Sequence, residues 1–149
     1  VVKPSISAGA MRTYRLSPED AIPFDVYDKE MLVQPLMPSV TQEGEYSLFW
    51  FGGHYSHAIL KKPANGDFRV QPQFGGLETG VEPPADAVIL AEATLAACPF
   101  PVSYARVDML RDTHGNFTLM ELELIEPALF LHHAADKGAA FAASIRRTA

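Results

Sequence analysis

Three acidic residues in the C-terminal half of the chain have the spacing of a shared metal site. The segments 104–110 and 118–125 alternate apolar and polar residues, which predicts two strands of a hairpin with one apolar face. When the apolar residues of the two strands face each other, Asp108 falls directly opposite Glu121 and diagonal to Glu123. The carboxylates then gather on one face, about 5–8 Å apart at Cβ. Like charges this close repel, and a hard cation such as Mg²⁺, which prefers oxygen ligands, would hold them together.

The same register allows a second interpretation. It follows from three apolar pairs, which are Met109 with Met120, Val107 with Leu122 and Ala105 with Leu124, and it leaves 113–116 as a four-residue loop. It also places Arg106 opposite Glu123, where the guanidinium would neutralise one acid on a solvated strand face. The spacing alone favours this solvated face over a metal site.

The acidic strands belong to a chain in which predicted strands and helices are interleaved. Residues on both sides of Gly52-Gly53 predict a hairpin near 45–61, because glycine adopts the positive φ angles of a tight turn without steric cost. The other predicted elements are at most a short helix after Ser17, a strand near 31–37, a loop through 62–83, a helix at about 85–97 and a helix from Asp136 to Arg147. We expect an α+β fold, with an antiparallel sheet and helices packed on one of its faces.

The 45–61 hairpin contains a histidine among apolar residues. We expect Tyr46, Leu48 and Trp50 to lie opposite Ile59, His57 and Tyr55, respectively, on one face. A histidine on an apolar face is more often a hydrogen-bonded packing residue than a metal ligand. We therefore favour the packing role for His57.

Composition and charge narrow the classes of function. The 149 residues are 48% hydrophobic, which suits one domain with a core, and the net charge of -6 is the wrong sign for binding nucleic acid. One cysteine, Cys98, excludes an internal disulfide, and no apolar run approaches the roughly 20 residues of a membrane span. We expect a cytoplasmic protein that binds neither nucleic acid nor membranes. Val1–Pro4 resemble the end of a buried strand, so we also expect that part of the protein precedes them.

The acidic strands resemble the C-terminal signature of the ATP-grasp enzymes, most closely their glutathione-synthetase-like branch. In that branch a strand ending in Asp precedes a Glu-Ile-Asn strand, and here Asp108 precedes Glu121-Leu122-Glu123. The resemblance implies that Asp108, Glu121 and Glu123 bind the magnesium ions of MgATP. Glu123 replaces the usual Asn, an exchange also found in the cyclo-ligase group of cycloserine biosynthesis. The resemblance extends over essentially the whole chain and implies an ATP-grasp-like antiparallel sheet.

Further motifs occur in the order of that family. Val1–Pro4 resembles the strand whose lysine, here Lys3, reaches the nucleotide phosphates. The small-residue segment 5–15, which contains Gly9, takes the place of the loop that covers them. Backbone amides in such a loop can cradle phosphate while a lysine supplies a point charge.

The resemblance also assigns the nucleoside contacts. The segment 32–38 is similar to the one that reads adenine through backbone groups near Gln34 and Leu36. Glu45 matches the acid that holds the ribose hydroxyls, whereas Ser47 stands where the branch usually has Arg.

A basic residue is expected at the transferring phosphate. Arg69, between Gly66 and Gly75-Gly76, matches the loop arginine that stabilises the phosphate and the acyl-phosphate intermediate. Lys61 and Lys62 rank below Arg69 for this role. His132-His133 is expected at the surface rather than as a metal pair, and Cys98 as a small apolar residue.

The resemblance implies an ATP- and magnesium-dependent ligase that joins a small-molecule carboxylate to an amine through an acyl phosphate. The alternatives are a peptide-modifying or cyclising ligase on the same scaffold, a catalytically silent ATP-binding regulatory module, and an acidic structural domain without a nucleotide site. The fragment by itself is expected to be inactive. The sequence leaves the oligomeric state open, and a homo-oligomer is compatible with it.

Overall fold

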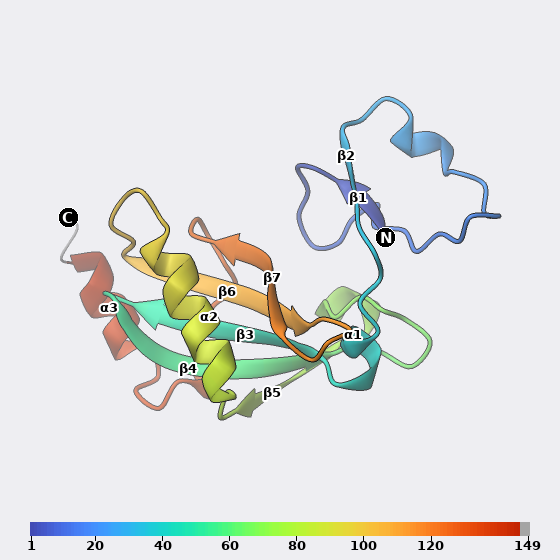
Figure 1. Cartoon of the computed structure of the whole chain (residues 1–149). Helices are drawn as coiled ribbons and strands as arrows, with labels where there is room; N and C mark the ends of the chain where they lie inside the picture. The colour runs from blue at the N-terminus through green and yellow to red at the C-terminus, as the bar shows by residue number, and fades with distance from the viewer. Residues whose placement is uncertain (147–149) are drawn as a thin grey trace. The chain divides into compact units, whose positions relative to one another are not determined.

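The computed structural model describes residues 1–146 of the chain (Figure 1). The chain forms two compact units, Val1–Pro38 and Ser39–Ala149. No helix among the described residues is long and apolar enough to cross a membrane.

The first unit contains one small antiparallel pair of strands, β1 (Val2–Pro4) and β2 (Met31–Val33). The predicted strand near 31–37 is shorter than expected, and Pro35, which has no N–H to donate, follows it closely. The short helix considered after Ser17 is absent from this unit. A carboxylate oxygen of Asp20 accepts a hydrogen bond from the Ser17 amide at 2.5 Å, which closes a turn, and a single 3₁₀ turn, η1 (Phe24–Val26), follows.

The second unit contains a five-stranded antiparallel sheet in the order β5-β4-β3-β6-β7. The strands are β3 (Glu45–Phe51), β4 (His54–Lys62), β5 (Leu77–Val81), β6 (Tyr104–Arg111) and β7 (Phe117–Glu123). The predicted α+β fold with an antiparallel sheet is confirmed. The loop prediction for 62–83 was wrong at its end, because Leu77–Val81 adds an edge strand to β4. The short helix α1 (Ser39–Gln42) and the 3₁₀ turn η2 (Pro72–Phe74) were not predicted.

The helices lie on opposite faces of the sheet. Helix α2 (Ala85–Ala96), predicted at about 85–97, buries Ala87 and Ala91 against one face. Helix α3 (Ala139–Arg146) places Phe141 against Phe51 on the other face. The prediction that helices pack on one face was therefore wrong for α3. The sequence pattern does not indicate to which face the long segment after β7 returns.

The last helix begins later than predicted. Asp136 is not in the helix; its carboxylate accepts hydrogen bonds from the amides of Gly138 and Ala140 at 2.9 and 2.7 Å. A short polar side chain in this position satisfies amides that have no partner within the helix. The predicted end at Arg147 lies outside the described residues.

Two bulges change the predicted registers. In the β3–β4 hairpin, Trp50 pairs with Tyr55 as predicted, but Ser56 is extra, so that Phe49 rather than Leu48 lies opposite His57. The remaining pairs shift with it, and Leu48 and Tyr46 lie opposite Ala58 and Leu60. A bulge inserts one residue into one strand and displaces all later pairs by one.

In the β6–β7 hairpin, the predicted pairs of Asp108 with Glu121, Val107 with Leu122 and Arg106 with Glu123 are confirmed. Met109 lies opposite Leu119 rather than Met120, because the register shifts just beyond Asp108. Strand β7 ends at Glu123, so Leu124 is not paired with Ala105, and the connection is 112–116 rather than 113–116.

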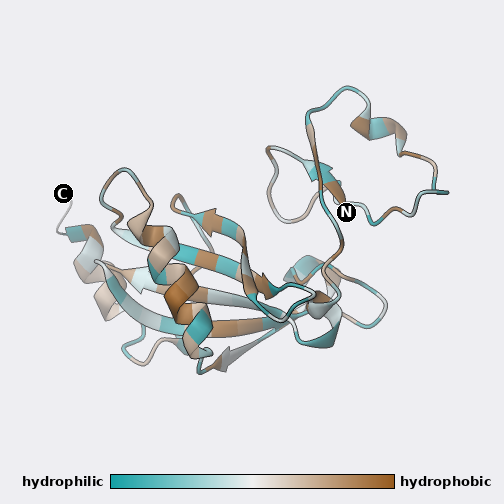
Figure 2. Ribbon diagram, in the orientation of Figure 1, coloured by the Kyte–Doolittle hydropathy of each residue, from teal (hydrophilic) through white to brown (hydrophobic). Residues whose placement is uncertain are grey.

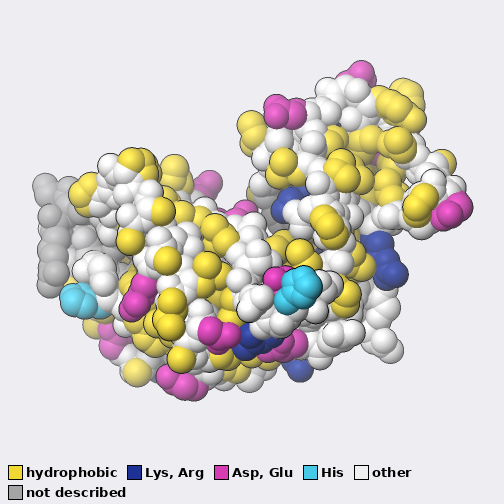
Figure 3. Space-filling view, in the orientation of Figure 1, with side chains coloured by type: hydrophobic (Ala, Val, Ile, Leu, Met, Phe, Trp, Pro, Cys, Tyr) yellow, Lys and Arg dark blue, Asp and Glu magenta, His cyan; other side chains and the backbone are white. Residues whose placement is uncertain are grey.

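Alternation along the strands gives the sheet two different faces. The α2 face carries the apolar set Leu48, Trp50, Ala58, Val107 and Met109. The opposite face, here called the α3 face, carries Phe49, Phe51 and Ile59 at one end and charged residues at the other. Figure 2 shows hydrophilic and hydrophobic residues alternating along β6. Hydrophobic side chains also gather at the surface over α2 (Figure 3).

Candidate functional site

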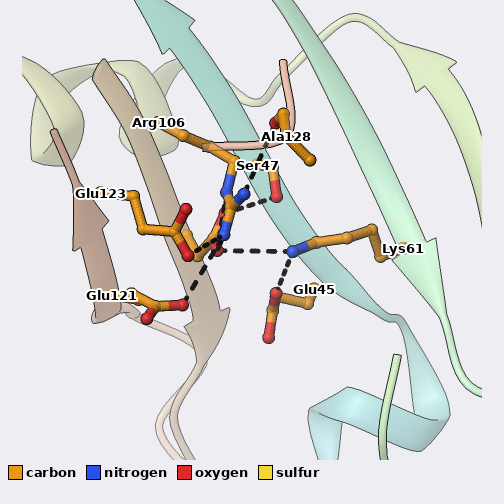
Figure 4. A network of polar contacts seen from close by, with 8 residues as sticks. Glu45, Ser47, Lys61, Arg106, Glu121, Glu123 and Ala128 are labelled. Carbon is orange, nitrogen blue, oxygen red and sulfur yellow. Dashed lines mark hydrogen bonds and ion pairs between the residues drawn. The ribbon is translucent and has the colours of Figure 1, made fainter. Parts of the chain in front are cut away.

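The charged end of the α3 face collects side chains from four neighbouring strands. Residues paired directly across strands project to the same face of a sheet. The pairs Glu45 with Lys61, Ser47 with Asp108, Asp108 with Glu121 and Arg106 with Glu123 therefore place one cluster on this face. We call it the charge network; its members are Glu45, Ser47, Lys61, Arg106, Asp108, Glu121 and Glu123 (Figure 4).

Asp108 lies at the buried centre of the charge network, with 2% of its surface exposed. The Ser47 hydroxyl donates to Oδ1 at 2.5 Å, the Arg106 guanidinium donates to both carboxylate oxygens at 2.9–3.1 Å, and Lys61 Nζ lies 3.4 Å from Oδ2. Burial by itself would raise the pKa of Asp108. The charges of Lys61 and Arg106 and these hydrogen bonds outweigh burial and hold that pKa below its ordinary value. Asp108 is therefore a buried, ionised carboxylate.

Arg106 contacts all three acids that the sequence singled out. Besides its bonds to Asp108, its Nη2 atom lies 2.7 Å from Glu123 Oε1 and 3.7 Å from Glu121 Oε2. Nη1 donates to the Ala128 carbonyl at 3.5 Å. Burial would lower the pKa of Arg106, but the neighbouring carboxylates raise it. The ion pair of the second interpretation therefore exists, together with the three-acid cluster of the first.

The second cation of the charge network is Lys61, which forms a close ion pair with Glu45. Burial would lower the pKa of Lys61, but the charges of Asp108 and Glu45 raise it. Burial raises the pKa of Glu45 despite this partner. On the sequence alone, Lys61 ranks below Arg69 as the cation at the transferring phosphate, and Arg106 serves only to neutralise Glu123. The contact of Lys61 with Glu45 was missed because it depends on the β3–β4 register, which the bulge at Ser56 shifts by one residue.

Glu121 is the most accessible acid of the charge network. Its side chain is 54% exposed, compared with 30% for Glu123 and 3% for Asp108. Partial burial raises the pKa of Glu121, and the charges of Glu123 and Asp108 raise it further. A carboxylate that is exposed and repelled by its neighbours gains most from a cation. The donors are all oxygen atoms, which fits Mg²⁺ rather than a transition metal.

Arg69 lies in a contact set of its own. Its Nε and Nη2 atoms donate to the two carboxylate oxygens of Asp67 at 3.0 and 2.7 Å, and its guanidinium lies 3.6 Å from the centroid of the Phe74 ring. The hydrogen bonds from Arg69 lower the pKa of Asp67. The contacts found for this guanidinium are thus with Asp67 and Phe74, which belong to the same loop. The catalytic role of Arg69 stays a prediction.

The four remaining predicted nucleotide contacts belong to the first unit. Lys3 lies in β1 opposite Leu32, and Gly9 has a φ of 62° in the small-residue segment. The backbone N–H and C=O of Gln34 both pair with Val1, at 3.0 and 2.7 Å, and Leu36 is half-buried. The roles of Lys3, Gly9, Gln34 and Leu36 stay predictions.

His57 has the surroundings of a packing residue. Its ring stacks on Phe49 with centroids 4.3 Å apart, and Nε2 lies 3.0 Å from the Leu129 carbonyl oxygen. Burial lowers its pKa, so that the neutral ring, protonated on Nε2, donates to this carbonyl. Cys98 is a half-buried free cysteine just after α2.

The chain has measurable similarity to known proteins, although no family model matches it. It is 32% identical over 122 residues to the cycloserine biosynthesis protein DcsG of Streptomyces lavendulae, with 77% of this chain and 41% of that protein covered. The crystal structure of D-cycloserine synthetase DcsG matches at a TM-score of 0.67 over the same shares. A D-alanine–D-alanine ligase from Bacillus anthracis, complexed with ATP, matches at 24% identity and a TM-score of 0.49, covering 71% of this chain and 38% of that one.

The antiparallel sheet and this similarity support the resemblance to the ATP-grasp superfamily that the sequence indicates. Within the superfamily it resembles D-cycloserine synthetase. The chain spans about 41% of the length of that relative.

Proposed function

We propose that the chain is part of an ATP- and magnesium-dependent ligase of the glutathione-synthetase-like branch, which joins a small-molecule carboxylate to an amine. The observation that carries the proposal is the charge network, in which Asp108, Glu121 and Glu123 share one face with two buried cations. We place residues 1–149 in the C-terminal part of an ATP-grasp domain. This placement follows the order of the resembling motifs. The match covers 41% of the relative, and the substrate-binding part would come from the rest of the protein.

The oxygen donors of the charge network fit Mg²⁺. When bound, the ion would neutralise charge that develops on the phosphates of ATP. Asp108, Glu121 and Glu123 would hold it, and Arg106 now occupies oxygen atoms of Asp108 and Glu123. Glu121, exposed and 3.7 Å from that guanidinium, can change partner at the least cost. Arg106 would thus share its carboxylates with the ion.

The reaction proceeds in two displacements. An oxygen of the substrate carboxylate bonds to the γ-phosphorus while the bond to the bridging oxygen breaks and ADP leaves. The amine nitrogen then bonds to the acyl carbon, the bond from that carbon to the phosphate oxygen breaks, and the amine loses a proton. In a cyclising ligase, the alternative on this scaffold, both groups belong to one molecule. Lys61 and Arg106 are ionised, so that they can stabilise negative charge on the transferring group.

The nucleotide contacts follow the resemblance. Glu45 would hold the ribose hydroxyls, Lys3 the phosphates, and the segment around Gly9 would cover them. Gln34 and Leu36 would frame the adenine.

The test of the proposal is the Glu121→Gln variant of the full-length protein. Glutamine keeps the shape of the side chain and removes its charge, so Mg²⁺-dependent ATP binding should be abolished while the fold is retained. Calorimetric titration of ATP with and without Mg²⁺ measures this. A Glu121→Gln protein that binds MgATP like the parent contradicts the metal assignment. ADP release that depends on added carboxylate and amine separates a ligase from a silent ATP-binding module.

Arg69 and Lys3 should have different effects on kinetics. Arg69 would stabilise the transferring phosphate, so Arg69→Ala should lower kcat by about 10²-fold or more with little change in the Kd of MgATP. Lys3 would contact phosphates that are already present in bound ATP, so Lys3→Ala should weaken MgATP binding. Turnover and nucleotide affinity are measured for both variants of the full-length protein. An unchanged kcat in Arg69→Ala would contradict the role of Arg69.

A further inference from the structure

A second group of metal-ligating side chains lies at the edge strand β5. Glu78 is in β5, and His132 and His133 end the 3₁₀ turn η3 (Leu131–His133). One ring nitrogen of each histidine and one carboxylate oxygen of Glu78 all lie within 4.8 Å of one another. We propose that these three residues, here called the His–Glu cluster, bind a divalent transition-metal ion of the zinc class. This site is separate from the charge network and does not depend on the proposed ligase function.

The geometry of the His–Glu cluster is close to that of a bound ion. Zinc binds imidazole nitrogen and carboxylate oxygen at about 2.0–2.2 Å, which sets tetrahedral ligand atoms roughly 3.4 Å apart. His132 Nε2 and Glu78 Oε1 are 3.8 Å apart, so small side-chain rotations complete the site. Two imidazoles and one carboxylate suit zinc, whereas the all-oxygen charge network suits magnesium. The fourth ligand position would be open to water.

An independent observation is the environment of His133. Its Nε2 atom is buried, and no hydrogen-bond partner for it occurs among residues 1–146. A buried polar atom without a partner costs free energy, and in native proteins it usually has a protein, water or ion partner. A metal ion bound to the imidazole through Nε2 would remove that cost.

Gly80 provides the space that His133 occupies. A Cβ atom at Gly80 would lie 2.9 Å from His133 Nδ1 and 3.5 Å from its Cγ. The φ angle of Gly80 is not among the positive ones, so its backbone does not require glycine. Gly80 lies two residues from Glu78 on the same face of the strand. Its lack of a side chain therefore makes room for an imidazole beside the carboxylate.

Contacts on both sides of η3 fix the position of the two histidines. The carbonyl oxygen of Ala128 accepts from Arg106, and that of Leu129 lies 3.0 Å from His57 Nε2. Lys137 Nζ donates to the His132 carbonyl at 2.9 Å. Lys61, opposite Glu78 in the sheet, contacts Glu45 and Asp108 instead (Figure 4). An ion in the His–Glu cluster would therefore tie the segment after β7 to the edge strand β5.

The experiment is a Zn²⁺ titration of the untagged full-length protein in excess Mg²⁺, followed by calorimetry and by thermal unfolding. We expect one equivalent of Zn²⁺ to bind and to raise the unfolding temperature. His132→Ala and Glu78→Gln should each weaken binding by at least about tenfold. His132 is 63% exposed, so its removal should leave the fold intact. Gly80→Ala should also weaken binding, because its Cβ displaces His133.

Two controls make the result decisive. His114→Ala removes an exposed histidine of the 112–116 loop and should leave Zn²⁺ affinity unchanged. Glu121→Gln tests whether Zn²⁺ enters the charge network instead. The proposal is wrong if the parent protein binds no Zn²⁺ under these conditions. It is equally wrong if the His132→Ala and Glu78→Gln variants bind Zn²⁺ as the parent does, or if only Glu121→Gln loses it.

Discussion

The charge network and the His–Glu cluster lie on the same face of one sheet and satisfy their polar groups in different ways. In the charge network, Arg106 and Lys61 supply cations from the protein itself to Asp108, Glu123 and Glu45. In the His–Glu cluster, His133 Nε2 has no partner among the described residues. The acids of the charge network therefore have cationic partners without a ligand, and a metal ion bound there would compete with Arg106. The His–Glu cluster has no internal cation in that place, so an ion adds a contact without displacing one.

The largest expected effect comes from removing the internal cation. Arg106→Ala leaves the buried carboxylate of Asp108 without its bidentate partner, and losing one partner of a buried ion pair costs about 3 kcal/mol or more. Urea unfolding measures the change in the free energy of unfolding. Arg111→Ala is the matched control, since that arginine pairs with the more exposed Glu43 and Asp86 and should cost about 1 kcal/mol or less. Equal losses in the two variants would mean that the charge network is not internally neutralised as described.

An intermediate effect is expected from His57, which holds the segment leading to the His–Glu cluster. Burial lowers the pKa of His57 in the folded protein, so the folded state disfavours its protonation. Its contribution to stability is present above the unfolded pKa of about 6.5 and is lost as the pH falls toward the folded value. The slope should reach at most about 1.4 kcal/mol per pH unit.

The measurement is the free energy of unfolding from about pH 7.5 to about pH 5, a range that spans the ordinary histidine pKa. His57→Gln should flatten the pH dependence. His54→Gln, which changes an exposed histidine of the same strand, should keep it. A parent profile that is flat over this range, or two variants with the same profile, would contradict the assignment.

The smallest expected effect on stability is that of Glu121→Gln without metal. Glu121 is repelled by Glu123 and Asp108, and its side chain is half exposed, so removing its charge should change the free energy of unfolding by less than about 0.5 kcal/mol, in the stabilising direction. Urea unfolding in the presence of a chelator measures this. Together with lost MgATP binding, this result would separate the ligand role of Glu121 from any role in folding. A marked destabilisation would show instead that Glu121 supports the folded network.

Local sequence patterns predicted the elements that bear the acids. Alternation over 104–110 and 118–125 placed Asp108 opposite Glu121 and Arg106 opposite Glu123, as observed. The helix at about 85–97 follows from helix-forming residues between Pro84 and Pro99. The bulges at Ser56 and Met120 were missed, because an extra residue in a strand leaves the alternation on each side intact. Strand β5 was missed because Leu77–Val81 contains glycine and exposed residues and gains its backbone partners only from β4.

The sequence by itself determined the chemistry available to this protein: carboxylates at a two-residue spacing on β7, an arginine two residues before Asp108, and adjacent histidines after the last strand. The placement of the strand residues follows from local periodicity, which fixes the face on which each of their side chains projects. Only the tertiary structure decided which of them meet. Lys61 reaches Asp108 because β4 and β6 both flank β3, and His132 reaches Glu78 because the chain after β7 returns to the edge strand β5. Such contacts join residues far apart in sequence, and their partners are set by packing of the whole sheet rather than by any local pattern.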